Sequence, residues 1–484
     1  MKILIKDGEI VDPANQRDCE ILDLLIVDGK IACIHKNISV DDATVIDATG
    51  LVVTPGFIDM HVHLREPGQE HKETIRTGTR SAVKGGFTSI LAMANTNPVP
   101  DSPLVIKDIL SRIKDQAVIN VYLAGSVTMG LLGENLVNID ELVEAGVIAL
   151  SDDGKPVMNS QIMRDALLAC KNRVFSNPPL SPKGIFNMPL RKKGKSDTSP
   201  LEKERATSPP LEKGDFKTHD IPIISHCEWI DAEYEGWIMN KGAVSERLGL
   251  IGIPNSAEYH MVERDIKLAE ETGGHLHIAH VSTAESVELI RNAKNKGIKI
   301  SAETTPHHFT ITDEMVEICG ANAKMNPPLR SKEDLEAVIE GLKDGTIDVI
   351  ATDHAPHAEY EKAKGLKEAP FGIVGLETCL PLVITKLVNE NHLTLFEAIK
   401  KLTVNPAKIL NLNKGTLSEG ADADICIIDI NKEFIVDPTK FESKGRNTPF
   451  AGWKLTGVTM ITIANGSIIL TEPKIAESLF CKFD

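Results

Sequence analysis

Two histidines one residue apart, His61 and His63, stand at the end of an apolar run that begins at Gly56. On a β-strand alternate side chains share a face, so the pair could offer two imidazole nitrogens to one metal ion. Arg65 follows two residues after His63, where alternation would place it on the same face, and it adds a guanidinium group that can bind an anion. Ordinary hydrogen-bonded histidines can show the same spacing. The prediction of a metal site therefore depends on whether other ligands arrive at the same place.

Short apolar runs recur along the chain, and most are followed by a polar residue that can bind a metal or an anion. The runs cover residues 88–92, 118–123, 147–150, 221–224, 275–279, 298–302 and 347–351. The polar residues after them are Asn95, Asp152, Asp153, His226, His280, Glu303 and Asp353. Only the run 118–123 lacks such a residue. Together with the run before His61 these make eight predicted strands, the number that closes a barrel.

Segments with helical periodicity alternate with these runs, at residues 73–84, 139–145, 158–170, 257–271, 284–294 and 332–342. This alternation predicts an α/β fold of the (β/α)8, or TIM-barrel, class. In such a barrel all parallel strands end at one face, where side chains far apart in the sequence meet. We therefore interpret the polar residues at the strand ends as one shared metal site.

Both ends of the chain are predicted to form β-structure. Short strands are expected at residues 3–5, 24–27, 30–34 and 51–53, with turns at Asp7-Gly8 and Asp28-Gly29, and again at 423–429, 458–464 and 467–470, with a turn at Asn465-Gly466. We expect residues 1–54 and 415–484 to build one small β-sandwich-like domain. The barrel, residues 55–414, would be inserted between its two halves.

Residues 172–220 are rich in Pro, Lys and Ser and contain a near repeat, 198–203 and 207–213. Such a segment cannot build a core, so we expect a disordered insertion in the barrel. It joins a helix to a strand and should leave the barrel on the face opposite the site. The functional alternative is a basic docking arm.

Composition narrows the class of protein. The chain has 484 residues, 42% of them hydrophobic and 25% charged, which exceeds the needs of a barrel alone. A net charge of −16 and 4% aromatic residues argue against a nucleic-acid partner. The eight cysteines form no Cys-x-x-Cys pair, so neither disulfides nor a thiolate zinc site is indicated. No signal peptide or membrane-length apolar run is seen, and a cytoplasmic enzyme is expected.

The motifs together resemble those of the type I, bacterial dihydroorotases in the metal-dependent amidohydrolase superfamily. Residues 59–68 and 351–357, followed by Lys362, resemble the two diagnostic motifs of that family. Supporting similarities lie at residues 95–96, 151–154, 226–228, 280–283, 305–308, 324–330 and 370–377. The resemblance covers nearly the whole chain except the insertion.

The resemblance implies reversible, zinc-dependent hydrolysis of dihydroorotate to N-carbamoyl-aspartate, a step of pyrimidine (UMP) biosynthesis. One Zn²⁺ would be bound by His61, His63 and Asp353, a second by His226 and His280, with Asp153 bridging the two. Asp353 would also take the proton of the attacking water and pass it to the departing ring nitrogen. The substrate contacts implied are those of His63, Arg65, Asn95, Asn326, His357, Phe371 and Gly372.

Several assignments stay open. Asp152 is a close rival to Asp153 as the bridging ligand, and the carboxylated lysine that bridges the metals in many relatives is missing, since Lys155 lies too far into the loop. A related cyclic amidohydrolase, such as a hydantoinase, dihydropyrimidinase or allantoinase, is one alternative function. A non-catalytic subunit that scaffolds aspartate carbamoyltransferase is another, although such a subunit has no need to keep metal ligands. Aspartate carbamoyltransferase is a possible partner, and a homo-oligomer is expected.

Other polar residues near the strand ends are given structural roles. Those expected to be structural are His275 and His277 in the barrel wall, and His354 and Cys227 pointing away from the metals. His307 and His308 follow Glu303 and could line the site, but they are assigned no catalytic role. Glu303 is predicted to orient one of the metal-binding histidines.

Overall fold

Eight parallel strands form the predicted barrel in this computed structural model, which describes residues 1–174, 218–230 and 236–471. The strands follow one another around the sheet in chain order. They are β6 (Phe57–Val62), β7 (Phe87–Ala92), β8 (Asn120–Gly125), β9 (Ala149–Leu150), β12 (Ile223–Ser225), β15 (Leu276–Ile278), β16 (Ile300–Thr304) and β17 (Val349–Ile350). The barrel closes where the His63 amide donates to the His354 carbonyl at 2.9 Å. Each strand coincides with one predicted from the sequence, so this prediction is confirmed.

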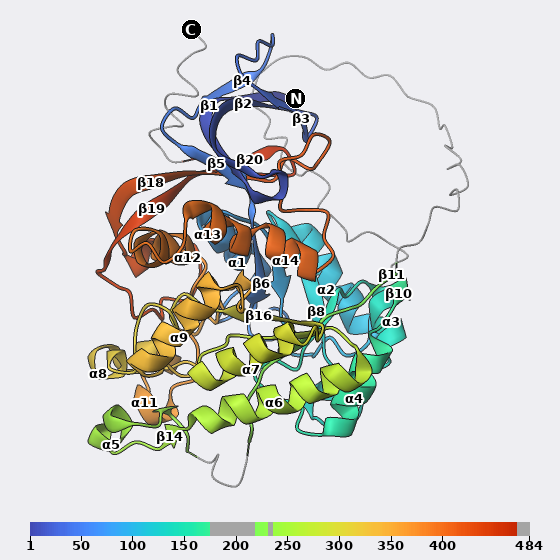
Figure 1. Ribbon diagram of the computed structural model, residues 1–484, viewed down its shortest axis with the longest axis vertical. Helices are drawn as coiled ribbons and strands as arrows, with labels where there is room; N and C mark the ends of the chain where they lie inside the picture. The colour runs from blue at the N-terminus through green and yellow to red at the C-terminus, as the bar shows by residue number, and fades with distance from the viewer. Residues whose placement is uncertain (175–217, 231–235, 472–484) are drawn as a thin grey trace, which may run out of the picture.

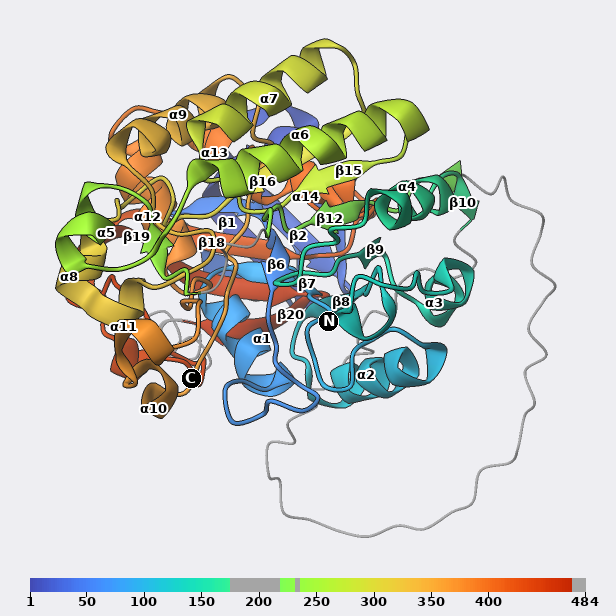
Figure 2. The same cartoon turned by 90° about the horizontal axis from the view of Figure 1, so that it is seen from below.

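Helices surround the barrel (Figure 2). The six predicted ones are α1 (Ile75–Lys84), α3 (Ile139–Ala145), α4 (Ser160–Ala169), α6 (Asn255–Thr272), α7 (Ala284–Asn295) and α9 (Lys332–Lys343). Those not predicted from the sequence include α2 (Pro103–Gln116), α13 (Leu395–Leu402), α14 (Val404–Ile409) and a π-helical turn, η4 (Val383–Val388). Shorter helices are α5 (Ala243–Leu248), α8 (Met315–Cys319), α10 (Glu359–Lys362), α11 (Gly365–Glu368) and α12 (Cys379–Leu382). Single 3-10 turns are η1 (Pro13–Asn15), η2 (Met129–Leu131), η3 (Gly320–Ala323) and η5 (Pro438–Lys440).

The barrel strands are buried on both faces, which explains why they appear in the sequence as continuous apolar runs. On β15, Leu276 and Ile278 pack outward with the helices in the main core cluster. Ala279 has the other parity and packs with Met60 of β6 and Leu91 of β7 in a separate cluster inside the barrel. Side chains on the parity of Ala279 therefore face the barrel interior.

A second sheet contains strands from both chain ends and lies at one end of the barrel (Figure 1). Its strands are β1 (Lys2–Asp12), β2 (Arg17–Val27), β3 (Lys30–His35), β4 (Thr44–Asp47), β5 (Val52–Pro55), β18 (Ile425–Ile435), β19 (Lys454–Ala464) and β20 (Ser467–Thr471). The two ends meet where β5 pairs antiparallel with β18. The sheet has a hydrophobic core of its own. The boundaries 1–54, 55–414 and 415–484 stay a prediction, but both halves of the predicted end domain share this sheet.

One of the predicted turns is wrong. Asp28-Gly29 joins β2 to β3 and Asn465-Gly466 joins β19 to β20, as expected. Asp7-Gly8 instead lies inside the continuous strand β1, where the pairing with β2 shifts register between Ile5 and Gly8. Asp7 has φ 54°. The Asp-Gly dipeptide suggested a hairpin turn because such turns need a positive φ. The positive φ of Asp7 belongs instead to a β-bulge within β1.

The predicted insertion leaves the barrel as a pair of short strands, β10 (Arg173–Val174) and β11 (Thr218–His219), which run antiparallel. Residues 175–217, on which the prediction of disorder rests, lie outside the described part of the chain. Asp220 accepts hydrogen bonds from the Asn172 amide at 2.9 Å and from Lys299 Nζ at 2.8 Å. Lys299 immediately precedes β16, so the base of the insertion lies where barrel strands begin, as predicted. Two further strands, β13 (Met239–Asn240) and β14 (Gly252–Ile253), pair with each other.

Within the described ranges no helix is both long enough and apolar enough to cross a membrane.

Candidate metal centre

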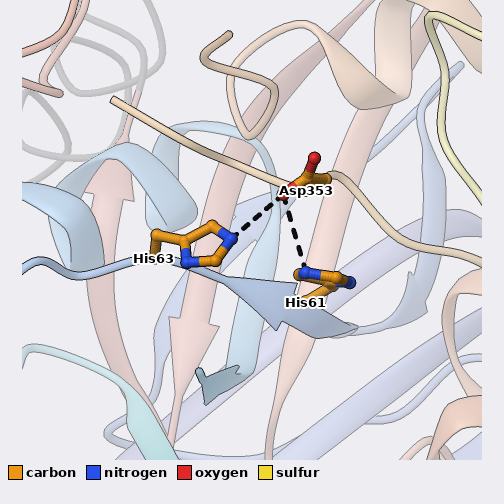
Figure 3. A group of neighbouring side chains, drawn as sticks. All are labelled: His61, His63 and Asp353. Carbon is orange, nitrogen blue, oxygen red and sulfur yellow. Dashed lines mark hydrogen bonds and ion pairs between the residues drawn. The ribbon is translucent and has the colours of Figure 1, made fainter. Parts of the chain in front are cut away.

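The six predicted metal ligands gather at the carboxyl ends of the barrel strands. His61 lies in β6 and His63 directly follows it, and the other four follow β9, β12, β15 and β17: Asp153, His226, His280 and Asp353. His61 and His63 point toward Asp353 (Figure 3). The distance from Asp353 Oδ1 is 3.1 Å to His63 Nε2 and 3.6 Å to His61 Nε2.

Asp153 lies among the four histidines. Its Oδ1 is 3.2 Å from His61 Nε2, 3.5 Å from His226 Nδ1 and 3.7 Å from His280 Nε2. Its Oδ2 is 3.3 Å from His63 Nε2. Burial alone would raise the pKa of this carboxyl, but the charge of His61 and the nearby imidazoles of His226 and His280 hold it well below the ordinary value. The carboxylate is therefore ionised and faces both groups of histidines.

The rival carboxylate, Asp152, is turned away from the histidines. It accepts hydrogen bonds from the backbone amides of Val127 at 2.7 Å and Thr128 at 3.1 Å, and from the Thr128 hydroxyl. Through these bonds both oxygens of Asp152 are held by the loop that follows β8. The geometry therefore favours Asp153 over Asp152 as the ligand.

The side chains present fit a divalent metal ion. Three buried atoms at this centre have no hydrogen-bond partner among the described residues: His61 Nε2, Asp153 Oδ1 and His226 Nε2. The ligand atoms lie within 4.8 Å of one another in two groups, His61 with His63 and Asp353, and His61 with Asp153 and His280. Buried polar atoms without partners are costly, and imidazole and carboxylate are the donors that zinc accepts. A cation shared by these donors would satisfy them.

His226 belongs to neither of these two groups. Its Nδ1 lies 2.9 Å from His280 Nε2, and its Nε2 lies 3.5 Å from Glu228 Oε2. Its assignment to a second metal, with His280, therefore stays a prediction.

Two neighbours orient His61 and His63. His61 Nδ1 lies 2.7 Å from Glu303 Oε1, and His63 Nδ1 lies 2.8 Å from Asn95 Oδ1. Each oxygen accepts a hydrogen bond from the imidazole, which leaves Nε2 directed at the centre. Glu303 was predicted in this role from the sequence, whereas Asn95 was predicted only as a substrate contact.

Three residues of the centre have a backbone that ordinary residues seldom adopt. The φ angles are 60° at Arg65, 33° at His280 and 46° at Asp353. Non-glycine residues in this region carry conformational strain, which persists only where the surrounding structure imposes it, often at functional sites. Each of the three lies just beyond a barrel strand. The positive φ turns the chain at each of these residues, which brings the side chain over the end of the barrel.

Arg65 lies beside the metal ligands with most of its guanidinium buried. Its Nε donates to the Pro356 carbonyl at 3.3 Å, and one terminal nitrogen lies 3.4 Å from His357 Nε2. His357 Nε2 donates to the Phe371 carbonyl at 2.8 Å. Burial and the charge of Arg65 lower the pKa of His357 to about 2, so His357 is neutral. Three of the predicted substrate contacts thus touch one another.

The other predicted substrate contacts adjoin this group. Gly372 has φ 123°, and a Cβ there would lie 2.7 Å from Ala355 Cβ, so only glycine fits without displacement. Asn326 donates to Glu228 Oε1 at 3.0 Å, which links it to the side of the centre formed by His226. The sequence analysis gave no role to Glu228, although it follows His226 by two residues.

Two buried lysines hold the loop that carries Phe371 and Gly372. Lys362 Nζ donates to the carbonyls of Pro370 and Gly372, both at 2.9 Å. Lys324 Nζ donates to the carbonyls of Leu366 and Ala369, both at 2.7 Å, and lies 4.5 Å from the centre of the Phe371 ring. Both lysines lie in motifs that resemble those of the family, but no function was predicted for either.

Asn447, which lies between β18 and β19, also reaches this loop. Its Nδ2 donates to the carbonyls of Ala355 at 3.1 Å and Gly372 at 3.0 Å, and its Oδ1 accepts from the His357 amide at 3.2 Å. No local pattern marks this asparagine, so sequence reasoning missed it.

Apart from His307, the side chains expected to be structural bond to groups other than the predicted metal ligands. Cys227 contacts Asp265 at 3.8 Å, and His354 Nδ1 accepts from the Gly375 amide at 3.2 Å. His308 bonds the Thr305 hydroxyl at 2.8 Å and the Pro327 carbonyl at 3.1 Å. His307 is buried near Asp353, and burial holds its pKa well below the ordinary value. His275 and His277 lie inside the barrel wall, as predicted.

Comparison with known proteins identifies the family. A family profile described as Dihydro-orotase-like matches residues 50–173, and one described as Amidohydrolase family matches residues 214–469. The chain is 47% identical to a dihydroorotase of Acetivibrio thermocellus, over 97% of this chain and 99% of that protein. It is 48% identical to a dihydroorotase of Pelotomaculum thermopropionicum, over 98% and 99% of the two.

Among solved structures, an L-hydantoinase (dihydropyrimidinase) from Arthrobacter aurescens matches with a TM-score of 0.78 and 24% identity, over 97% of this chain and 96% of that one. This similarity shows a shared fold. The sequence matches to the two dihydroorotases also show the family, because they span almost the whole length of this chain and of each relative. The chain therefore belongs to the amidohydrolase family and, within it, to the dihydroorotases.

Proposed function

We propose that this protein is a dihydroorotase, which opens the ring of dihydroorotate to N-carbamoyl-aspartate and closes it again in pyrimidine biosynthesis. The observation that carries the proposal is the buried guanidinium of Arg65 beside a cluster of metal-binding side chains. A cyclic amide that bears a carboxylate needs both parts, a centre that activates water and a cation that holds the anion. Full-length relatives named dihydroorotase support it.

The metal is proposed to be zinc, with two ions in each subunit. His61, His63 and Asp353 would hold one, His226 and His280 the other, and Asp153 both. Bound there, the ions would act as Lewis acids on the substrate carbonyl and make a water molecule acidic enough to ionise near pH ~7.

Asp353 is the proposed proton carrier. Burial would raise its pKa, but the hydrogen bond from His63 and the charge of His61 lower it, so the group is ionised and has oxygens that can take a proton. The oxygen of water attacks the ring carbonyl carbon, and Asp353 takes the proton that this oxygen loses. As the carbon–nitrogen bond breaks, Asp353 gives the proton to the ring nitrogen. The reverse sequence closes the ring.

Arg65 is proposed to bind the substrate carboxylate through its planar pair of N–H donors, together with Asn95 and Asn326. His357 and the backbone at Phe371 and Gly372 would complete the pocket. Because Arg65 is already held by the Pro356 carbonyl, little of its side-chain freedom would be lost on binding.

We propose that the protein works in the cytoplasm as a homo-oligomer, and that aspartate carbamoyltransferase is a possible partner. A subunit that only scaffolded the transferase would not need the six predicted metal ligands to converge.

The proposal is tested by turnover of dihydroorotate, hydantoin and allantoin by one preparation whose metal content is measured. We expect turnover of dihydroorotate with at least one bound zinc ion, and little turnover of the other two. Faster turnover of hydantoin or allantoin would assign the protein to another cyclic amidohydrolase. Absence of all three activities in a zinc-loaded sample would favour the scaffold.

A further inference from the structure

A row of polar side chains, all buried except the partly buried His275, runs through the barrel interior from the candidate metal centre. Beyond His61, Glu303 Oε2 lies 3.2 Å from His277 Nε2. His277 Nδ1 lies 2.8 Å from Ser301 Oγ, and Ser301 Oγ lies 3.1 Å from His275 Nε2. With the 2.7 Å contact of His61 and Glu303, four hydrogen bonds join five side chains.

Two neighbouring strands position this row. β15 and β16 are parallel neighbours (Figure 2), and His277 is directly opposite Ser301 in their register. Ser301 and Glu303 are two residues apart on β16, so they share a face. His275 and His277 have the parity of Ala279, which packs inside the barrel. The row therefore starts at the metal centre and leads toward the end of the barrel where the strands begin.

Burial makes this row costly unless every member is bonded. His277 and Glu303 are both 0% exposed and Ser301 is 5% exposed. A barrel interior is ordinarily filled by branched apolar side chains. A buried polar network rigidifies its members when all of them are satisfied, and it is destabilising when one lacks a partner. The hydrogen bonds among these residues therefore supply partners that the buried Glu303, His277 and Ser301 need.

The chemistry of Glu303 fixes the two donors that contact it. A carboxylate oxygen accepts hydrogen bonds, so His277 Nε2 donates to Glu303 Oε2 and His61 Nδ1 donates to Glu303 Oε1. The Ser301 hydroxyl links His277 Nδ1 to His275 Nε2, because one hydroxyl can both donate and accept.

We propose that His277, Ser301 and His275 are positioning residues for the metal centre. They fix the orientation of Glu303, which in turn keeps the proton of His61 on Nδ1 and leaves Nε2 for the metal ion. The inference rests on the proposed function only in that the centre binds a metal. Glu303 touches a ligand directly, whereas the other three act through it, from the far side of the centre.

Removing a member of the row should weaken metal binding while the ligands themselves remain. In His277→Leu one oxygen of Glu303 loses its donor, so the carboxylate is no longer held against His61. Partners of ligating histidines typically change metal affinity by about 10–100-fold. We expect zinc affinity to fall by about tenfold in His277→Leu and by roughly threefold in Ser301→Ala, which lies one bond further away.

Two variants separate positioning from general damage. His277→Gln keeps a donor and an acceptor in the side chain and should recover most of the zinc affinity. Thr304→Val, on the same strand, removes a buried hydroxyl that donates to the Val281 carbonyl at 2.8 Å but lies outside the row. We expect Thr304→Val to lower stability and to leave zinc affinity unchanged.

The measurement is zinc affinity of the full-length protein, by competition with a chromophoric chelator and without substrate. Weaker binding in His277→Leu and Ser301→Ala, with recovery in His277→Gln, would support the proposal. Wild-type affinity in the folded variants, or an equal loss in Thr304→Val, would overturn it. If His277→Leu does not fold, Ser301→Ala and His277→Gln decide. Because no substrate is present, failure of dihydroorotate turnover would contradict the proposed function without affecting this result.

Discussion

At the scale of single residues, Asp353 combines a ligand's position with the chemistry of a proton acceptor. Its Oδ1 lies 3.1 Å from His63 Nε2. Asp353→Asn would keep one oxygen for the metal but remove the group that accepts the proton. We expect kcat to fall by roughly a hundredfold or more, since a positioned acid or base contributes about 10²–10⁴-fold. Steady-state kinetics at saturating zinc, with metal content measured, would test this. A nearly normal kcat would assign the proton transfer to another group.

Arg65 is the residue on which substrate choice depends in this account. Arg65→Lys keeps the positive charge but loses the planar pair of donors. We expect kcat/KM for dihydroorotate to fall by an amount equivalent to about 1.5–3 kcal/mol, the contribution of one hydrogen bond to a charged group. A hydantoin without a carboxylate is the control substrate and should show little loss. Equal losses on both substrates would mean that Arg65 only supports the fold around Pro356.

The residues that meet at the candidate metal centre could be predicted because strand ends in a parallel barrel share one face. Residue type and position together pointed to His61, His63, His226, His280 and Asp353. The choice between Asp152 and Asp153 required coordinates, because both follow the same short strand. Asn447 could not have been found at all. Asn447 lies between two strands of the end sheet, β18 and β19. Its contact with the site depends on how this segment packs against residues 355–372, which are far from it in the sequence.

At the scale of elements, continuous apolar runs predicted all eight barrel strands, because parallel strands are buried on both faces. Helix α2 was overlooked although Pro103 stands at its first position and Ile106, Ile109 and Ile113 form its buried stripe. The error at Asp7-Gly8 is different. A bulge and a hairpin turn both need a positive φ, so the dipeptide alone does not distinguish them.

The two strands at the base of the insertion offer a test of its role. Val174 is paired with Thr218 in antiparallel register, so an Asn-Gly turn could join them directly in place of residues 175–217. Asp220 is anchored to Lys299 at the strand beginnings, away from the metal ligands. We expect kcat, KM and zinc content to be unchanged, with thermal stability equal or slightly higher, because closing a long loop costs entropy. Loss of zinc or of activity would show that the insertion supports the barrel.

At the scale of the whole molecule, the buried row in the barrel makes stability depend on pH. The pKa of His275 is lowered to about 4 by burial and by the neighbouring charges of His277 and Lys299, whereas an unfolded histidine titrates near ~6.5. Between these values the unfolded chain binds a proton that the folded protein does not. The free energy of unfolding should therefore fall as pH is lowered from ~6.5 toward about 4, by about 2 kcal/mol at pH ~5.

His275→Gln should remove this part of the pH dependence while it keeps a donor for Ser301. Urea unfolding of the metal-free wild type and variant, at neutral pH and near pH ~5, would measure the difference in slope. The same loss of stability in both proteins would show that His275 is not the group responsible.

The central claim is that the converging histidines and aspartates hold a metal on which opening of the dihydroorotate ring depends. The most direct test is turnover of dihydroorotate by one preparation before chelation, after complete removal of metal and after zinc is returned, with metal content measured at each stage. We predict that activity disappears with the metal and returns with zinc, because the proposed nucleophile forms near neutral pH only at a metal centre. Full turnover in a verified metal-free sample would contradict the claim.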